Sequence, residues 1–362
     1  MRNAFFRLLR HSLHPKKGFF TEKLTPEEWN TMYRMAKEHA IIGILFSGIE
    51  HLPAELRPPK DILLTWFSAT EKIRKTNQLL DARAVEITNY FRKEGFESCI
   101  LKGQGLARLY PTTQLRTPGD IDIWIAGKRN DILSHCQKVC PSFEVRYHHM
   151  HFPFFQDVEV EVHFTPSWMN YPVDNYRLQH FFKLERHRQM SHALIPFTET
   201  GNISVPTAEF NRIYILLHIY RHFLGEGIGL RQLIDYYYVL QQGFTDYERL
   251  KTIYWLQKLH MVRFAASVMH IMKEVFELDE NFLLLKPNSK IGTLLINEVM
   301  MAGNFGKYDK RIDRHRQDSA LHRFVSSIRR NGHFLHHYPL EVLYDAPFKL
   351  WLYGWRKLKG YK

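Results

Sequence analysis

SCILKGQGLARLYPTTQLRTPGDIDIWI, residues 98–125, is the most informative stretch of the chain. A strand predicted over Phe96–Leu101 leads into two closely spaced glycines, and turn residues then precede a second strand, predicted over Asp120–Ile125. Side chains two apart on a strand point to the same side, so Asp120 and Asp122 share one face. Carboxylates held this close repel each other unless a cation lies between them. Because oxygen ligands suit Mg²⁺, this pattern predicts a magnesium site.

Three regions can be distinguished around this stretch. Residues 1–95 are predicted to be helical, and residues 96–200 alternate between strand and helix signals. Residues 201–362 return to helical patterns. The N-terminal region includes a long helix that ends at Gly95 and buries one apolar face, made of Leu80, Ala84, Ile87 and Phe91. We therefore predict an α/β (α+β) fold, in which helical regions flank a small mixed-sheet core.

A later segment offers further polar groups to the same site. Val158–Phe164 alternates strictly between apolar and polar residues, which is typical of a half-buried strand, and Glu159, Glu161 and His163 share its polar face. If this strand lies beside Asp120–Ile125, three carboxylates converge, which is enough for a two-metal phosphoryl-transfer site. Either Glu159 or Glu161 can be the third acid. Between the two strands, a helix is predicted over Arg129–Cys140, with an apolar stripe made of Ile132, Leu133, Cys136, Val139 and Cys140.

Lys102-Gly103-Gln104-Gly105 has the features of a phosphate-binding turn. It follows a strand and precedes a short helix predicted over Gly105–Tyr110, where glycine lets backbone N–H groups approach phosphate oxygens. Lys102 and Arg116 would add positive charge. A G-x-G by itself occurs at many tight strand-to-helix turns, and this one matches neither the P-loop nor the dinucleotide-binding fingerprint.

Composition limits the partners and the cellular context. Lys and Arg outnumber Asp and Glu by 50 to 37, and this net charge of +13 is spread along the chain, so phosphate-bearing partners are plausible. No run of 18 apolar residues occurs, and no membrane span is expected. Three cysteines do not form a disulfide framework, which favours a reducing cytoplasm.

The remaining candidate residues are histidines and arginines. His148, His149 and His151 precede the Glu161 strand, but no cysteines accompany them, because Cys136 and Cys140 belong to the apolar helix stripe; a zinc site is not expected. Further along, Arg231 and Asp235 are four residues apart on a predicted helix. They either form an intrahelical ion pair or, with Arg221, face the cleft.

The order of these motifs resembles the DNA polymerase β–type nucleotidyltransferase superfamily. Within it, the chain is similar to the largely uncharacterised bacterial nucleotidyltransferase family. The matching segments are Ile100–Gly103, Leu109–Pro111, Arg116, Gly119–Asp122, Val160–His163 and Leu230–Asp235. The resemblance is strongest over residues 98–165 and extends to about 240. The usual serine after the glycine is Gln104 here, and the gap between Gly103 and Asp120 is longer than in the compact motif.

The resemblance implies a role for each matching residue. Asp120, Asp122 and Glu161 would hold Mg²⁺ (or Mn²⁺), and Lys102, Gly103, Gln104 and Arg116 would bind the triphosphate. The implied reaction moves a nucleoside monophosphate from an NTP, with ATP as the expected donor, to a hydroxyl of a small molecule or protein. Two rival hypotheses are an enzyme that adds nucleotides to RNA and a catalytically silent, antitoxin-like nucleotide-binding protein.

Overall fold

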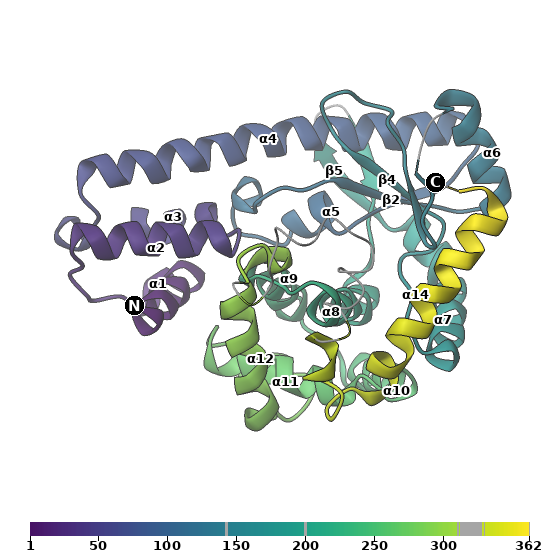
Figure 1. The fold of residues 1–362 in the computed structure, drawn as a ribbon. Helices are drawn as coiled ribbons and strands as arrows, with labels where there is room; N and C mark the ends of the chain where they lie inside the picture. The colour runs from purple at the N-terminus through teal and green to yellow at the C-terminus, as the bar shows by residue number, and fades with distance from the viewer. Residues whose placement is uncertain (142–143, 199–200, 310, 312–327, 329, 362) are drawn as a thin grey trace.

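A small four-stranded sheet surrounded by helices forms the computed structural model of the protein, which describes residues 1–141, 144–198, 201–309, 311, 328 and 330–361 (Figure 1). The predicted α+β class is confirmed. The strand order is β1-β2-β4-β3, and the strands are β1 (Ser98–Leu101), β2 (Ile121–Ile125), β3 (His149–His151) and β4 (Val160–His163).

The sheet register brings the polar residues of three strands together. β2 pairs antiparallel with β1 and parallel with β4, and Asp122 lies directly opposite Glu161. β3 pairs antiparallel with β4, so that His149 lies opposite His163 and His151 opposite Glu161. Residues paired across neighbouring strands point to the same side of a sheet. One face therefore carries both acids and the histidines.

The opposite face of the sheet is apolar and is covered by two helices. Its residues Ile121, Ile123 and Ile125 pack in one cluster with the buried faces of α4 (Lys60–Lys93) and α6 (Arg129–Val139). The predicted apolar stripe of α6 is too wide, because Val139 is 42% exposed. The long helix α4 ends as predicted, with Gly95 at φ +82° just beyond it.

The other helices lie mainly at the two ends of the chain. Figure 1 shows α4 running along one side of the molecule, from the N-terminal helices to the sheet. The remaining α-helices are α1 (Arg2–Leu13), α2 (Pro26–Glu38), α3 (Ile42–Glu50), α5 (Gly103–Ala107), α7 (Pro172–Ser191), α8 (Ala208–Gly225), α9 (Leu230–Gln241), α10 (Asp246–Lys258), α11 (Val262–Glu274), α12 (Ser289–Ala302) and α14 (Pro339–Lys359). Short 3-10 helices span Pro15–Lys17, Ala54–Leu56, Thr113–Leu115 (η3), Glu280–Phe282 and Asn304–Gly306. No helix in these ranges is both long and apolar enough to cross a membrane.

Two elements differ from the sequence-based expectation. α5 begins at Gly103 rather than Gly105, because the chain turns at Lys102, where φ is +47°. A hairpin of β5 (Ala193–Thr198) and β6 (Gly201–Ser204), which was not predicted, joins α7 to α8.

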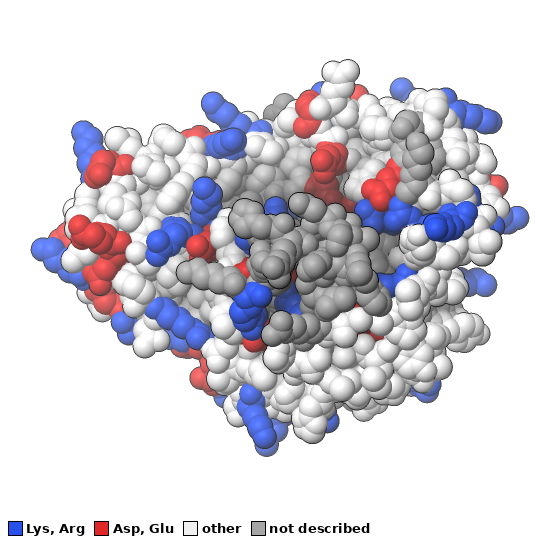
Figure 2. All heavy atoms as spheres, viewed as in Figure 1, with Lys and Arg blue, Asp and Glu red and all other residues white. Residues whose placement is uncertain are grey.

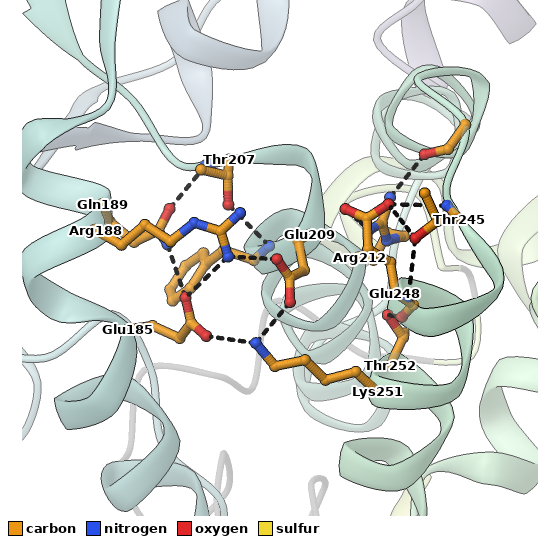
Figure 3. A network of polar contacts seen from close by, with 12 residues as sticks. Glu185, Arg188, Gln189, Thr207, Glu209, Arg212, Thr245, Glu248, Lys251 and Thr252 are labelled. Atoms are coloured by element: carbon orange, nitrogen blue, oxygen red, sulfur yellow. Dashed lines mark hydrogen bonds and ion pairs between the residues drawn. The ribbon is translucent and has the colours of Figure 1, made fainter.

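A polar network joins α7, α8 and α10 (Figure 3). Lys251 on α10 lies between Glu185 on α7 and Glu209 on α8, with its Nζ 3.2 Å and 2.7 Å from their carboxylate oxygens. Arg188 on α7 also pairs with Glu209. Each charge in this cluster has an opposite charge beside it. These ion pairs hold α8 against α7 and α10.

Candidate active site

The polar face of the sheet forms one wall of a cavity of about 450 Å³. This volume lies within the usual range of small-ligand sites. The opposite wall comes from α8 and α9. The charged residues and histidines along the cavity are Lys102, Arg116, Asp120, Asp122, Arg146, His148, His149, His151, Glu161, His163, His218, Arg221, His222, Glu226, Arg231 and Asp235.

Asp122 is a buried acid in the cavity wall that the sheet forms. Its side chain is only 3% exposed, and its Oδ1 lies 2.7 Å from Lys102 Nζ and 2.8 Å from His163 Nε2. Burial alone would raise the pKa of Asp122, but the charge of Lys102 and the hydrogen bond with His163 outweigh it and lower that pKa. Asp122 is therefore ionised at neutral pH.

Glu161 lies opposite Asp122 across the β2–β4 pair. Its Oε2 is 3.5 Å from His163 Nε2 and 3.4 Å from His149 Nδ1. Burial opposes ionisation, but the His163 hydrogen bond and nearby positive charges lower the pKa of Glu161 to about 2. Glu159, the other candidate for the third acid, is exposed, precedes β4 and lines a separate surface groove. The geometry therefore favours Glu161.

Asp120 lies one residue before β2 and lines the same cavity. The negative charge of Asp122, followed by burial, raises the pKa of Asp120 to about 6. This carboxylate repulsion is what a divalent cation would relieve. An all-oxygen donor set of Asp120, Asp122 and Glu161 fits Mg²⁺ in its chemistry.

Arg116 is engaged in a buried ion pair. Its Nε and Nη2 lie 2.7 Å and 2.8 Å from the two carboxylate oxygens of Asp235 on α9, and Tyr110 donates to the same carboxylate at 2.6 Å. Asp235 thus pairs with Arg116 rather than with Arg231, its neighbour one turn away. The pair fixes the β1–β2 connection against α9, so Arg116 is held at the cavity wall by its partner.

The turn after β1 presents its backbone, rather than the Gln104 side chain, to the cavity. The Gln104 amide is buried and donates to Asp81 on α4 and, at 3.4 Å, to the carbonyl of Asn77. Gly103, by contrast, lines the cavity at φ +34°, and a Cβ there would lie 3.5 Å from the Asp120 carbonyl oxygen. The positive φ favours glycine at this position.

Arg221 and Arg231 supply positive charge from the helical wall. Arg221 donates to Ser167 Oγ at 3.0 Å and lies over the Trp168 ring; Arg231 donates to the carbonyls of Thr117 and Pro118. Burial lowers the pKa of Arg221 to about 9 and, with help from nearby Arg116, that of Arg231 to about 10. No described carboxylate lies within 4 Å of either guanidinium. Largely enclosed cations without a directly paired carboxylate suit an anionic ligand.

Three buried histidines also gather beside Glu161, although the sequence favoured ordinary roles for them. His149 Nδ1 and His148 Nε2 are 2.9 Å apart, and the ligand nitrogens of His148, His149 and His163 lie within 4.8 Å of one another. The alternation of apolar and polar residues along β4 predicted that His163 lies on the same face as Glu161. Nothing in the sequence indicated that residues 149–151 form the strand next to β4.

Comparison with known proteins now adds a family. Residues 25–277 match the family described as "Uncharacterised nucleotidyltransferase". The chain belongs to this family. The match includes β1 to β4 and reaches beyond residue 240, where the sequence resemblance was expected to end.

A solved structure gives a weaker likeness, and the curated proteins give none. The structure is that of an antigenic nucleotidyltransferase-like protein from Paracoccidioides brasiliensis, which is 10% identical, with a TM-score of 0.35 over 61% of this chain and 97% of that one. No curated protein matches the sequence.

Proposed function

We propose that the protein is a metal-dependent nucleotidyltransferase of the polymerase β type. It moves a nucleoside monophosphate from an NTP, with ATP as the expected donor, to an acceptor hydroxyl and releases pyrophosphate. The observation that carries this proposal is the placement of Asp122 opposite Glu161, facing a cavity whose other wall holds Arg221 and Arg231. Acids that suit a metal and cations that suit a triphosphate thus face each other.

In this proposal Asp120, Asp122 and Glu161 hold Mg²⁺ (or Mn²⁺). When bound, the metal neutralises charge on the triphosphate and activates the acceptor hydroxyl, as in other two-metal sites. Lys102 and His163 keep Asp122 ionised through contacts of 2.7 Å and 2.8 Å. The pKa of Glu161, about 2, keeps it an anionic ligand and makes it too weak a base to take the acceptor proton unaided.

The phosphates are bound by groups from both walls. Arg221 and Arg231 contribute charge, and Lys102 and the backbone of Gly103 approach from the β1 side. Arg116 and Gln104 help to position the site rather than contact the phosphates. Arg116 holds the β1–β2 connection against α9, and Gln104 holds α5 against α4. Phosphoryl transfer depends mostly on positioning and on electrostatic stabilisation, which is what this arrangement supplies.

A small-molecule or protein acceptor is favoured over RNA. Figure 2 shows Lys and Arg side chains interspersed with Asp and Glu over the part of this face that the structure describes, rather than gathered into one band. A protein that follows a nucleic-acid backbone usually presents a continuous basic groove. The described part of the face in Figure 2 therefore gives no support for RNA as the acceptor.

The experiment that tests the reaction is a transfer assay. The protein is incubated with Mg²⁺, a panel of metabolites, proteins and RNA, and labelled ATP, GTP, CTP or UTP, and pyrophosphate release is scored. We expect release with one NTP and one acceptor class, and its loss in Glu161→Gln. Glu159→Gln is the matched control, because it changes an exposed acid two residues away. Equal activity of the two variants would contradict the role of Glu161.

A further inference from the structure

The histidines beside Glu161 form a cluster that the proposed reaction leaves unexplained. His148 precedes β3, His149 lies in β3 and His163 ends β4. All three are buried, with exposures of 8%, 9% and 1%. The β3–β4 register places His149 directly opposite His163, so the rings meet at one point of the cavity wall.

The hydrogen bonds within the protein do not satisfy this cluster. His148 and His149 contact each other, and His163 contacts Asp122 and Glu161. The second nitrogen of each ring, which is Nδ1 of His148, Nε2 of His149 and Nδ1 of His163, has no partner among the described residues. Buried polar atoms without partners cost free energy, and three adjacent buried imidazoles are costly to keep for packing alone.

The spacing of the donor atoms resembles that of a tetrahedral metal site. Zn²⁺ binds imidazole nitrogen and carboxylate oxygen at about 2.0–2.1 Å, so that neighbouring ligand atoms lie about 3.3 Å apart. Here one ligand nitrogen from each of His148, His149 and His163 lies within 4.8 Å of the other two, which is close enough for one ion to draw them to this spacing. Three imidazoles leave the fourth position of a tetrahedral site to water.

We propose that His148, His149 and His163 bind one divalent transition-metal ion of the Zn²⁺ class. Imidazole nitrogen suits Zn²⁺ and its neighbours, whereas Mg²⁺ takes oxygen ligands. The ion is therefore chemically distinct from the magnesium of the proposed reaction. The two ligand sets share no residue, binding of this ion does not depend on nucleotide transfer, and Asp120 takes no part in it.

Co²⁺ is the probe that tests this site, because the visible absorption of Co²⁺ reports its ligands and geometry. We expect the full-length protein, without nucleotide, to give the intense absorption of tetrahedral Co²⁺, which Zn²⁺ abolishes in a 1:1 ratio. His149→Gln should weaken the apparent affinity at least tenfold, and His148→Gln should do the same. His187→Gln, which changes an exposed histidine on α7, is the matched control and should leave binding unchanged.

The outcomes separate this site from the proposed function. Absence of tetrahedral Co²⁺ absorption in the wild type, or equal affinity in His149→Gln and His187→Gln, overturns the histidine site. Urea unfolding of the metal-free variants shows that each is folded. Asp120→Asn should lose Mg²⁺-dependent NTP binding and keep Co²⁺ binding. If no NTP binds to the wild type but Co²⁺ does, the reaction fails and the metal site stands.

Discussion

At the scale of single residues, the candidate site places acidic and cationic side chains around one cavity. Asp122 is neutralised by Lys102 and His163, whereas Arg221 and Arg231 have no described carboxylate within 4 Å. A group whose charge is buried without compensation destabilises the fold, and it is retained where a ligand provides the compensation. Substitution of these arginines should therefore weaken ligand binding without reducing the stability of the fold.

Arg221→Met should weaken NTP binding and leave the fold no less stable. Loss of one charge-assisted phosphate contact costs about 1.5–3 kcal/mol, or roughly tenfold to 100-fold in affinity. Methionine keeps an apolar contact with Trp168 and removes a cation whose pKa burial has lowered to about 9. Calorimetry with Mg²⁺-NTP and urea unfolding check the two effects. Unchanged NTP affinity would contradict the assignment of Arg221 to the phosphates.

The sequence predicted those parts of the site that depend on neighbouring residues. It did not predict contacts between residues that are far apart along the chain. The period of two on each strand indicated that Asp120, Asp122 and Glu161 share a face, because that property is local. The partners of Arg116 and Gln104 lie 119 and 23 residues away, at Asp235 and Asp81. No local sequence pattern indicates that Arg116 pairs with Asp235 or that Gln104 donates to Asp81.

At the scale of elements, packing and buried groups decide where helices lie. α3 approaches the backbone of η3 so closely that a Cβ at Gly43 would lie 2.5 Å from the Leu115 carbonyl oxygen. The N-terminus of α14 brings buried Glu341 to the backbone N–H groups of Asn170 and Tyr171. The hairpin β5–β6 was missed because β5 contains Pro196, which argues against a strand, and β6 has only four residues.

Gly43→Ala should destabilise the protein by about 1–3 kcal/mol, because the new methyl group meets backbone that cannot move aside. Urea unfolding measures the change. Gly225→Ala at the end of α8 is the matched control, because nothing lies within 4 Å of the added atom, and it should be neutral or slightly stabilising. Equal effects of the two substitutions would show that α3 does not pack this closely.

Glu341 should make stability depend on pH. Burial raises its pKa from 4.5 to about 7, although the N–H groups of Asn170 and Tyr171 oppose the shift. The folded state therefore binds the proton more tightly than the unfolded state. The stabilisation, up to about 3 kcal/mol, is fully present below pH 4.5 and is lost as the pH rises through about 7.

Glu341→Gln tests this dependence, because glutamine keeps an acceptor oxygen and cannot ionise. The difference in free energy of unfolding between the variant and the wild type should be small at pH 5 and should favour the variant at pH 8. Urea unfolding at both values measures it. A difference that does not change with pH would show that Glu341 is not a buried acid of raised pKa.

At the scale of the whole molecule, the chain is held by two apolar clusters, one on each side of the sheet, and the cavity lies on the side that carries the acids. One cluster joins N-terminal helices to α8, α9 and α11, and the other joins α4 and α6 to the sheet. The Arg116–Asp235 pair crosses between the β1–β2 connection and α9. The helical regions and the mixed sheet were predicted from their periodicities. The division at residues 95 and 200 stays a prediction.

Arg116→Met should destabilise the protein by about 3–5 kcal/mol, because it leaves the Asp235 carboxylate buried without its partner. The double variant Arg116→Met with Asp235→Leu should recover much of that loss, since neither charge then remains. Urea unfolding of both, with Mg²⁺-NTP calorimetry on the folded ones, makes the comparison. A single variant as stable as the wild type would mean that the pair does not fix α9 against the sheet.

The most direct test of the central claim is calorimetry of NTP binding with and without Mg²⁺ for the wild type, Asp122→Asn and Glu159→Gln. The claim is that the acids of β2 and β4 hold a metal that binds the triphosphate. The wild type and Glu159→Gln should bind NTP only when Mg²⁺ is present, and Asp122→Asn should lose this Mg²⁺-dependent binding. Binding by Asp122→Asn with wild-type affinity and the same Mg²⁺ dependence would contradict the claim.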